Sequence, residues 1–462
     1  MATSNAPEHR RWTAAILGGV TQPLGAVAAA APAAEGARRS EILEIAAGLF
    51  ADSGYVRTSL KDVADACGIL PGSLYHHFDS KQAIAIELLE RYHAELAQLG
   101  RSWLAEPAAR EAQPTCDLVV AFGTAVAECG IRHGAALQLS AYEPHAGATP
   151  MLVELARRKA VVVTAAMRQI LDDGAARGDL NPAVNPAMLA VQLCETMLHI
   201  GLARLYKDAL PAQTAALLGS MLLYGIAVEP PADQLLDNSA AMAGAIESIA
   251  DWSAPGQDDP DDRRAALRAV ARAEFARRGY EATTIRDIAA AAGLGIGSVY
   301  RLIDSKEALL ASIMNSYYSK LSAGYQAISG SGSTAIEKLD ALSWLNINAL
   351  DRFGAEFEIQ RAWFRSFPPA ANSLTDALKD RTLQIQNIVA QGLRDGEFRF
   401  HEVALQSLTP CVRDLIWIRP DVIELTDNRG ALAHSRAALL RGAATASGRA
   451  AASARTLRGL GA

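Results

Sequence analysis

Apolar residues recur along this chain at the spacing typical of α-helices. From Ile42 to Phe50 they fall at i, i+3, i+4, i+7 and i+8, which places one apolar stripe on a helix that Gly54 ends. Ser59, followed three residues later by Asp62, resembles a capping box and opens a second, short helix. The pattern therefore predicts a long helix followed closely by a short one.

Two more helices are predicted directly afterwards. Gly68 supplies a break with positive φ, and Pro71 lies where a third helix should begin, a position that tolerates its missing N–H. Asp79 and Ser80 are expected to cap a fourth helix over about residues 81–99. Two short helices joined by a Gly-containing turn form a helix-turn-helix, a motif that reads the major groove of DNA.

The same pattern occurs twice in the chain. Aligning Phe50 with Phe275 sets an offset of 225 residues, at which residues 46–83 match residues 271–308 at 17 of 38 positions without a gap. A duplicated unit of roughly 200 residues accounts for this match. The Pro/Asp-rich stretch 254–262 is the predicted linker between the two copies.

Both copies resemble the N-terminal domain of the TetR family of regulators. The pattern is specific because it sets turn chemistry, helix caps and a tyrosine at fixed spacings together. It runs through Thr58, Asp62, Gly68, Gly72, Ser73, Tyr75, His76, His77, Phe78 and Lys81, and through Thr283, Asp287, Gly293, Gly297, Ser298, Tyr300 and Lys306. The resemblance implies an all-α fold of two tandem units, each a helix-turn-helix domain plus a helical ligand-binding and dimerisation domain. It also implies a repressor that releases its operator when a small molecule binds.

The repeat divides the chain into domains. We expect a disordered Ala/Pro-rich tail (1–37), a first helix-turn-helix domain (38–100), a first sensor and dimerisation domain (101–253), the linker (254–262), a second helix-turn-helix domain (263–325), a second sensor domain (326–446) and a disordered tail (447–462). The N-terminal tail superficially resembles a signal peptide, but Gly18, Gly19 and Pro23 interrupt its apolar core.

The last part of each unit also repeats. Residues 174–180 and 392–398 share a Gly-x-x-x-Gly-acidic-apolar spacing at the end of a long helix, and apolar helices are predicted after both. In the TetR family the last two helices form a dimerising four-helix bundle. One chain with two such sets can pair them internally, so we predict an intramolecular pseudo-dimer. A homodimer that carries four heads is the alternative.

A DNA-reading head must offer groups for phosphates and side chains for base edges. We expect phosphate contacts from Thr58, Tyr75 and Lys81 in the first head and from Thr283, Thr284, Tyr300 and Lys306 in the second. Near bases we expect Leu70, Pro71, Ser73 and His76, and in the second head Gly295, Ile296, Ser298 and Arg301. The alternative for the tyrosines is simple packing, and one of His76 and His77 is expected to be half-buried.

Charge separates the two heads. Residues 38–100 carry six Lys/Arg against nine Asp/Glu, whereas residues 263–325 carry ten against five. Because affinity for the DNA backbone is chiefly electrostatic, the second head is expected to bind DNA better. The net charge of −6 for the whole chain is too small to imply a partner. The acidic first head leaves an alternative open, namely a helical ligand- or protein-binding module with degenerate heads.

Composition narrows the remaining function classes. Half of the residues are hydrophobic and 20% are charged, which is typical of a globular protein, and no apolar run reaches the roughly 18 residues that span a bilayer. Five scattered cysteines without CxxC spacing favour the reducing cytoplasm. The sequence contains no Walker loop, HExxH, GxSxG or kinase motif, so we expect no enzyme, no cofactor and no metal.

Aromatic residues concentrate in the second sensor domain. They are Trp344, Phe353, Phe357, Trp363, Phe364 and Phe367. One interpretation is a pocket between helices for a small apolar effector. The other is ordinary core packing.

Overall fold

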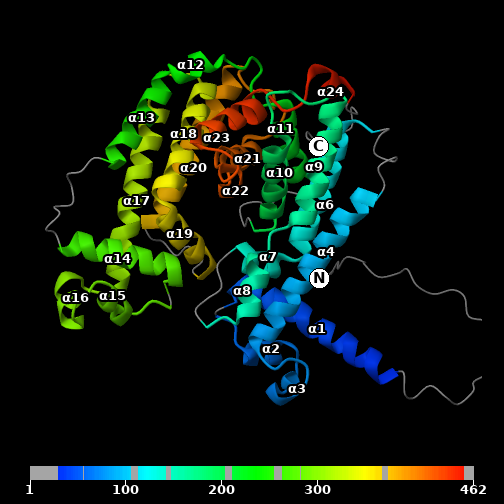
Figure 1. The fold of residues 1–462 in the computed structure, drawn as a ribbon, viewed down its shortest axis with the longest axis vertical. Coiled ribbons are helices and arrows are strands. Elements are labelled where there is room, and N and C mark those ends of the chain that lie inside the picture. The colour runs from blue at the N-terminus through cyan, green and yellow to red at the C-terminus, as the bar shows by residue number, and fades with distance from the viewer. Residues whose placement is uncertain are drawn as a thin grey trace, which may run out of the picture.

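The computed structural model describes residues 30–55, 57–105, 113–141, 147–202, 211–253, 263–280, 282–366 and 373–451. Apart from two isolated antiparallel bridges, these residues form helices and turns (Figure 1). This confirms the all-α fold. The predicted linker, residues 254–262, lies outside the described residues. So do residues 1–29 and 452–462 of the two predicted tails.

The two units follow one another, and their heads have the same order of elements. The first head comprises α1 (Ala30–Ser53), α2 (Leu60–Ala66), α3 (Pro71–Tyr75) and α4 (Lys81–Ala105), and its sensor comprises α6 (Thr115–Arg132), α7 (Gly134–Ala141), α8 (Pro150–Arg157), α9 (Val161–Ala176), α10 (Pro186–Ile200) and α11 (Pro211–Tyr224). The second head comprises α14 (Arg263–Arg278), α15 (Ile285–Ala291), α16 (Ile296–Leu302) and α17 (Lys306–Ser329). Its sensor comprises α18 (Ala335–Arg352), α19 (Gly354–Ser366), α20 (Ser373–Arg394), α21 (Leu405–Ile416), α22 (Pro420–Ile423), α23 (Asn428–Ser435) and the π-helical turn η2 (Arg436–Leu440). The last helix, α24 (Ala446–Ala451), packs on α6 of the first unit.

Helix α1 begins at Ala30 and α24 ends at Ala451, so both helices overlap the predicted tails. The boundary at residue 253 also needs correction. Helices α12 (Asp233–Asp237) and α13 (Ala240–Ser253) belong to the second unit by packing, and α13 lies along α17 and α18 (Figure 1). The Trp252 indole packs edge-on against Phe353 at 5.1 Å between ring centroids and donates to the Lys320 carbonyl.

The two units are joined by reciprocal backbone hydrogen bonds, which we call the clasp. Segments 222–228 and 439–445 exchange one set: Ile226 N to Leu439 O (2.7 Å), Ala227 N to Leu440 O (3.2 Å), Ala443 N to Leu222 O (2.9 Å) and Ala444 N to Leu223 O (2.8 Å). The ends of the repeated glycine motifs add another: Asn181 N to Ala443 O (2.8 Å), Thr445 N to Asp179 O (2.8 Å), Arg399 N to Ile226 O (2.9 Å) and Val228 N to Glu397 O (2.8 Å). Each bond that one unit donates has a counterpart donated by the other, which is the signature of a two-fold related contact.

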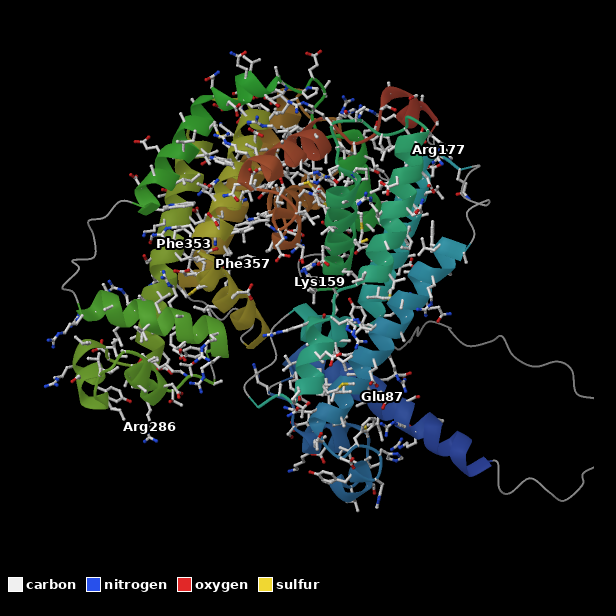
Figure 2. All side chains as sticks on the ribbon, in the orientation of Figure 1. Glu87, Lys159, Arg177, Arg286, Phe353 and Phe357 are labelled. Atoms are coloured by element: carbon white, nitrogen blue, oxygen red, sulfur yellow. The ribbon has the colours of Figure 1, made fainter. Side chains whose placement is uncertain are left out.

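Side chains extend this contact away from the clasp. The buried His434 of α23 lies 2.8 Å from the Gln192 side chain of α10. The Lys159 ammonium of the first unit is 2.6 Å from Asp421 on α22 (Figure 2). Helices α10 and α11 of the first unit therefore pack against α21, α22 and η2 of the second. Both heads lie below this contact in Figure 1.

Candidate nucleic-acid interface

Each head is built by the local chemistry that the sequence predicts. Ser59 and Thr284 cap α2 and α15, and each forms a complete capping box with the aspartate three residues later. Gly68 and Gly293 follow with φ of +65°, a conformation that favours glycine because it has no Cβ. The turn therefore has the same geometry in both heads, which confirms the two helix-turn-helix motifs.

In each head a lysine at the start of the fourth helix holds the connection between the first two helices. The Lys81 ammonium donates to the carbonyls of Tyr55 and Thr58, both at 2.8 Å, and lies 4.5 Å from the centre of the Tyr55 ring. Lys306 makes the same contacts, with the Tyr280 carbonyl at 2.9 Å and the Thr283 carbonyl at 3.0 Å. Burial lowers the pKa of Lys81. We call each of these a lysine bridge, and its contacts are structural rather than directed at DNA.

The expected phosphate contacts of Thr58 and Thr283 are wrong for the same reason. Both side chains are buried, and their hydroxyls donate to the backbone carbonyls of Gly54 at 3.0 Å and Gly279 at 2.8 Å. A hydroxyl that is buried and already bonded to the backbone cannot reach a phosphate without breaking the turn. These threonines close the turn between the first two helices of each head.

The recognition helices α3 and α16 leave their predicted DNA-facing residues at the surface. Tyr75 is 54% exposed and Tyr300 is 55% exposed, so neither packs the domain. Leu70, Pro71, Ser73, His76, Gly295, Ile296 and Arg301 are also exposed, while Ser298 is half-buried. His77 is half-buried, as expected of one of the two histidines. An exposed aromatic ring beside exposed polar residues is suited to contact with another molecule.

The second recognition helix carries more functional groups than the first. The Arg301 guanidinium donates to the Ser298 hydroxyl at 2.9 Å, which holds it along the exposed side of α16. A Cβ at Gly295 or Gly297 would meet no atom within 4 Å, so the backbone is open to close approach by a ligand. Arg286, at the second position of α15, extends from the lower edge of this head (Figure 2). It was not predicted, although its counterpart Lys61 is also a cation.

Part of the positive charge of the second head is neutralised within the domain. On α14, Arg277 lies 2.7 Å from Glu274, and Arg278 lies 2.9 Å from Asp287 of the second capping box. Hydrogen bonds from Thr284, followed by the hydrogen bond and charge of Arg278, lower the pKa of Asp287 to about 2. These pairs fix the positions of two arginines of α14, and they leave the net charge of the second head unchanged, because both acids are already included in its residue count.

A cluster in the first sensor has donor groups that suit a metal. The ligand atoms of Glu95, Cys129 and His133 lie within 4.8 Å of one another. Glu95, however, already accepts from Arg132 and lies 2.7 Å from His133. Burial raises the pKa of Cys129 to about 12, so the thiol stays protonated and is a poor ligand. The cluster is an ion-paired group where α4 meets α6, in which Cys129 is buried and Glu95 is partly exposed.

The expected effector residues divide into two groups. Trp344 is buried, with its ring 4.5 Å from the central carbon of the Arg429 guanidinium. Phe353, labelled in Figure 2, is buried between Trp252 and Tyr317, so both residues agree with core packing. Phe357 is half-buried and stacks on Trp417 at 6.1 Å between centroids. The side chains of Trp363 and Phe364, and the whole of Phe367, lie outside the described residues.

The lysine bridges give a test of how the heads are held. Lys306→Met should lower the free energy of unfolding by about 1–3 kcal/mol, because two carbonyls lose a charged donor. Lys61→Met, on the exposed side of α2, is the control and should change stability by less than about 0.5 kcal/mol. Thermal unfolding followed by circular dichroism measures both. Equal melting temperatures for the two variants would show that the lysine bridge does not contribute to the stability of the head.

Comparison with known proteins agrees with this arrangement. The family described as bacterial regulatory proteins, tetR family, matches residues 42–88 and 267–313. The HTH-type transcriptional repressor KstR2 of Rhodococcus jostii is 54% identical over 59 residues, which cover 13% of this chain and 29% of that protein. KstR2 of Mycolicibacterium smegmatis is 30% identical over 161 residues, which cover 34% of this chain and 78% of that protein.

Among solved structures, the ketosteroid transcriptional regulator KstR2 of Mycobacterium tuberculosis is 27% identical, with a TM-score of 0.33. That match covers 38% of this chain and 95% of the other. Within the described residues, none of the helices is both long and apolar enough to span a bilayer.

Proposed function

Because this chain belongs to the TetR family of bacterial regulators, with two tandem copies of its DNA-binding domain, we propose that it represses transcription by binding duplex DNA with both heads. The exposure of Tyr75 and Tyr300 on the recognition helices carries this proposal. An exposed tyrosine can donate a hydrogen bond from its hydroxyl to a phosphate oxygen, while its ring packs against the sugar. Repression is inferred from the relatives, which are named repressors. No catalytic step is needed.

We propose further that one chain is a complete pseudo-dimer. The reciprocal bonds of the clasp support this, because they use the ends of both sets of bundle helices within one chain. Gly225 and Gly442 occupy equivalent places with φ of +75° and +89°, and each lies against the backbone of the other unit. Approach this close leaves no room for a second chain at the same surface.

We also propose that a small apolar effector enters the second sensor and releases the operator. The half-buried Phe357 on α19 supports this, since a ligand beside it would displace that helix. Glu356, the residue directly before Phe357, is buried and lies 3.0 Å from Arg272 on α14 of the second head. A shift of α19 would therefore be transmitted to the head. The five cysteines are free, which supports action in the cytoplasm.

A mobility-shift assay with the DNA upstream of the protein's own gene tests DNA binding. Arg301→Ala should weaken binding about tenfold or more, because a guanidinium can hold guanine or phosphate with two hydrogen bonds. His76→Ala, at the equivalent position of the first head, is the matched variant and should weaken it less. Similar losses of affinity from both variants would contradict the expectation that the second head binds DNA more tightly than the first. If no duplex is shifted, the chain is a helical binding module with degenerate heads.

A further inference from the structure

The second sensor contains a buried arginine for which the described residues provide no counter-ion. Arg381 lies on α20 and is 5% exposed. Its Nε donates to the Ala377 carbonyl of its own helix at 3.3 Å, and its Nη2 is buried without a hydrogen-bond partner. It occupies a position of the apolar stripe that includes Leu378, Ile385 and Ile388, where an apolar residue is expected.

Aromatic rings surround this guanidinium in place of carboxylates. Its central carbon lies 5.5 Å from the centre of the Tyr318 ring and 5.9 Å from that of Tyr325, both on α17. The Tyr318 hydroxyl is also buried without a hydrogen-bond partner. Burial raises the pKa of neighbouring Tyr317 to about 12, and the charge of Arg381, together with a side-chain hydrogen bond between the two residues, opposes that rise. The phenols therefore stay neutral and supply donors, not charge.

A buried guanidinium stays charged, because its pKa is too high for it to lose a proton in a protein. Such a charge is costly unless it is paired and its N–H groups are bonded. Glu356 is near Tyr317, but it is already paired with Arg272. The contrast is Arg436, which is equally buried but lies 2.8 Å from the carboxylate of Asp340 and 2.7 Å from that of Asp237.

We propose that Arg381 and Tyr318 bind the carboxylate of an organic acid whose apolar body lies beside Tyr325 of α17 and Phe357 of α19. The carboxylate would accept from the Arg381 Nη2 and the Tyr318 hydroxyl, the two donors left without partners. This inference rests on the proposed effector site and names its ligand class. A carboxylate fits better than a phosphate, because a single guanidinium balances one negative charge and not two.

The test compares acids with their methyl esters on the full chain. Dodecanoate and 4-phenylbutanoate, their methyl esters and dodecyl phosphate are titrated by thermal shift and calorimetry. At least one acid should bind the wild type about 10- to 100-fold more tightly than its ester, because the ester lacks the charge that Arg381 meets. In Arg381→Met this preference should disappear.

A second readout needs no ligand. Without added acid, Arg381→Met should melt no lower than the wild type, because it removes a buried charge that lacks a partner. Arg436→Met is the matched control and should melt several degrees lower, because it leaves the buried Asp340 unpaired. A comparable loss for both variants would show that Arg381 is a structural residue and would overturn the proposal.

The remaining outcomes are equally decisive. If no acid raises the melting temperature, or if acid and ester bind alike, the carboxylate site is wrong. Tighter binding of dodecyl phosphate than of dodecanoate would also overturn it. Release of DNA is measured separately by mobility shift. If an acid binds through Arg381 but the operator stays bound, the acid site stands and the proposed effector mechanism fails.

Discussion

Light scattering of the purified protein is expected to give a mass near 48.9 kDa, that of a single chain. The clasp joins equivalent segments of the two units, and the helices it connects pack against each other within the chain. A linked partner has an effective concentration in the millimolar range, so internal pairing should outcompete a second chain. A mass near twice that of the chain would instead indicate a dimer with four heads.

Two glycine substitutions distinguish a disturbed contact between the units from a general loss of stability. A Cβ at Gly442 would overlap the backbone of Tyr224, and its φ is +89°. Gly396 has a φ of +72°, but a Cβ there would meet no atom within 4 Å. Gly396→Ala should therefore cost only the conformational strain, about 1–2 kcal/mol. Gly442→Ala should cost about 1–3 kcal/mol more, because it also overpacks the contact between the units.

Gly442→Ala should also change the mass of the protein in solution. Opening the clasp exposes the apolar faces of α10 and α11, which then need another partner. Self-association of Gly442→Ala, with Gly396→Ala staying at the mass of one chain, would support the pseudo-dimer. Equal stabilities for the two variants would mean that the contact seen between Gly442 and Tyr224 does not form in solution.

Features set by neighbouring residues could be predicted from the sequence. The capping box at Ser59, the positive φ at Gly68 and the start of α3 at Pro71 all depend on a few adjacent residues. The duplication was visible for the same reason, since each helix-turn-helix is a local motif. The fold of each head therefore followed directly from the sequence.

Features that depend on distant residues could not be predicted. The role of Lys81 is decided by carbonyls that lie 23 and 26 residues earlier in the chain. Helix α13 was assigned to the wrong unit because its apolar face does not identify its partner. Arg381 did leave a signal, since a charged residue interrupts an apolar stripe, but only its burial shows that the charge is unpaired.

The two recognition helices differ, so the operator should be asymmetric. At equivalent positions Leu70, Pro71 and His76 of the first head correspond to Gly295, Ile296 and Arg301 of the second. Identical heads related by a two-fold axis read a palindrome, whereas unlike heads prefer unlike half-sites about one helical turn apart. Selection from a random duplex library should therefore return two different half-sites for the wild type.

Exchanging one helix makes this prediction specific. When the segment 70–76 is replaced by the sequence of 295–301, selection should return an inverted repeat of the half-site of the second head. The chimaera should also bind the wild-type operator on the order of 100-fold more weakly, since each mismatched base pair costs about 1–3 kcal/mol. The reciprocal exchange is the control and should return an inverted repeat of the other half-site. If the chimaera selects the same DNA as the wild type, the first head does not read sequence, and specificity belongs to the second head alone.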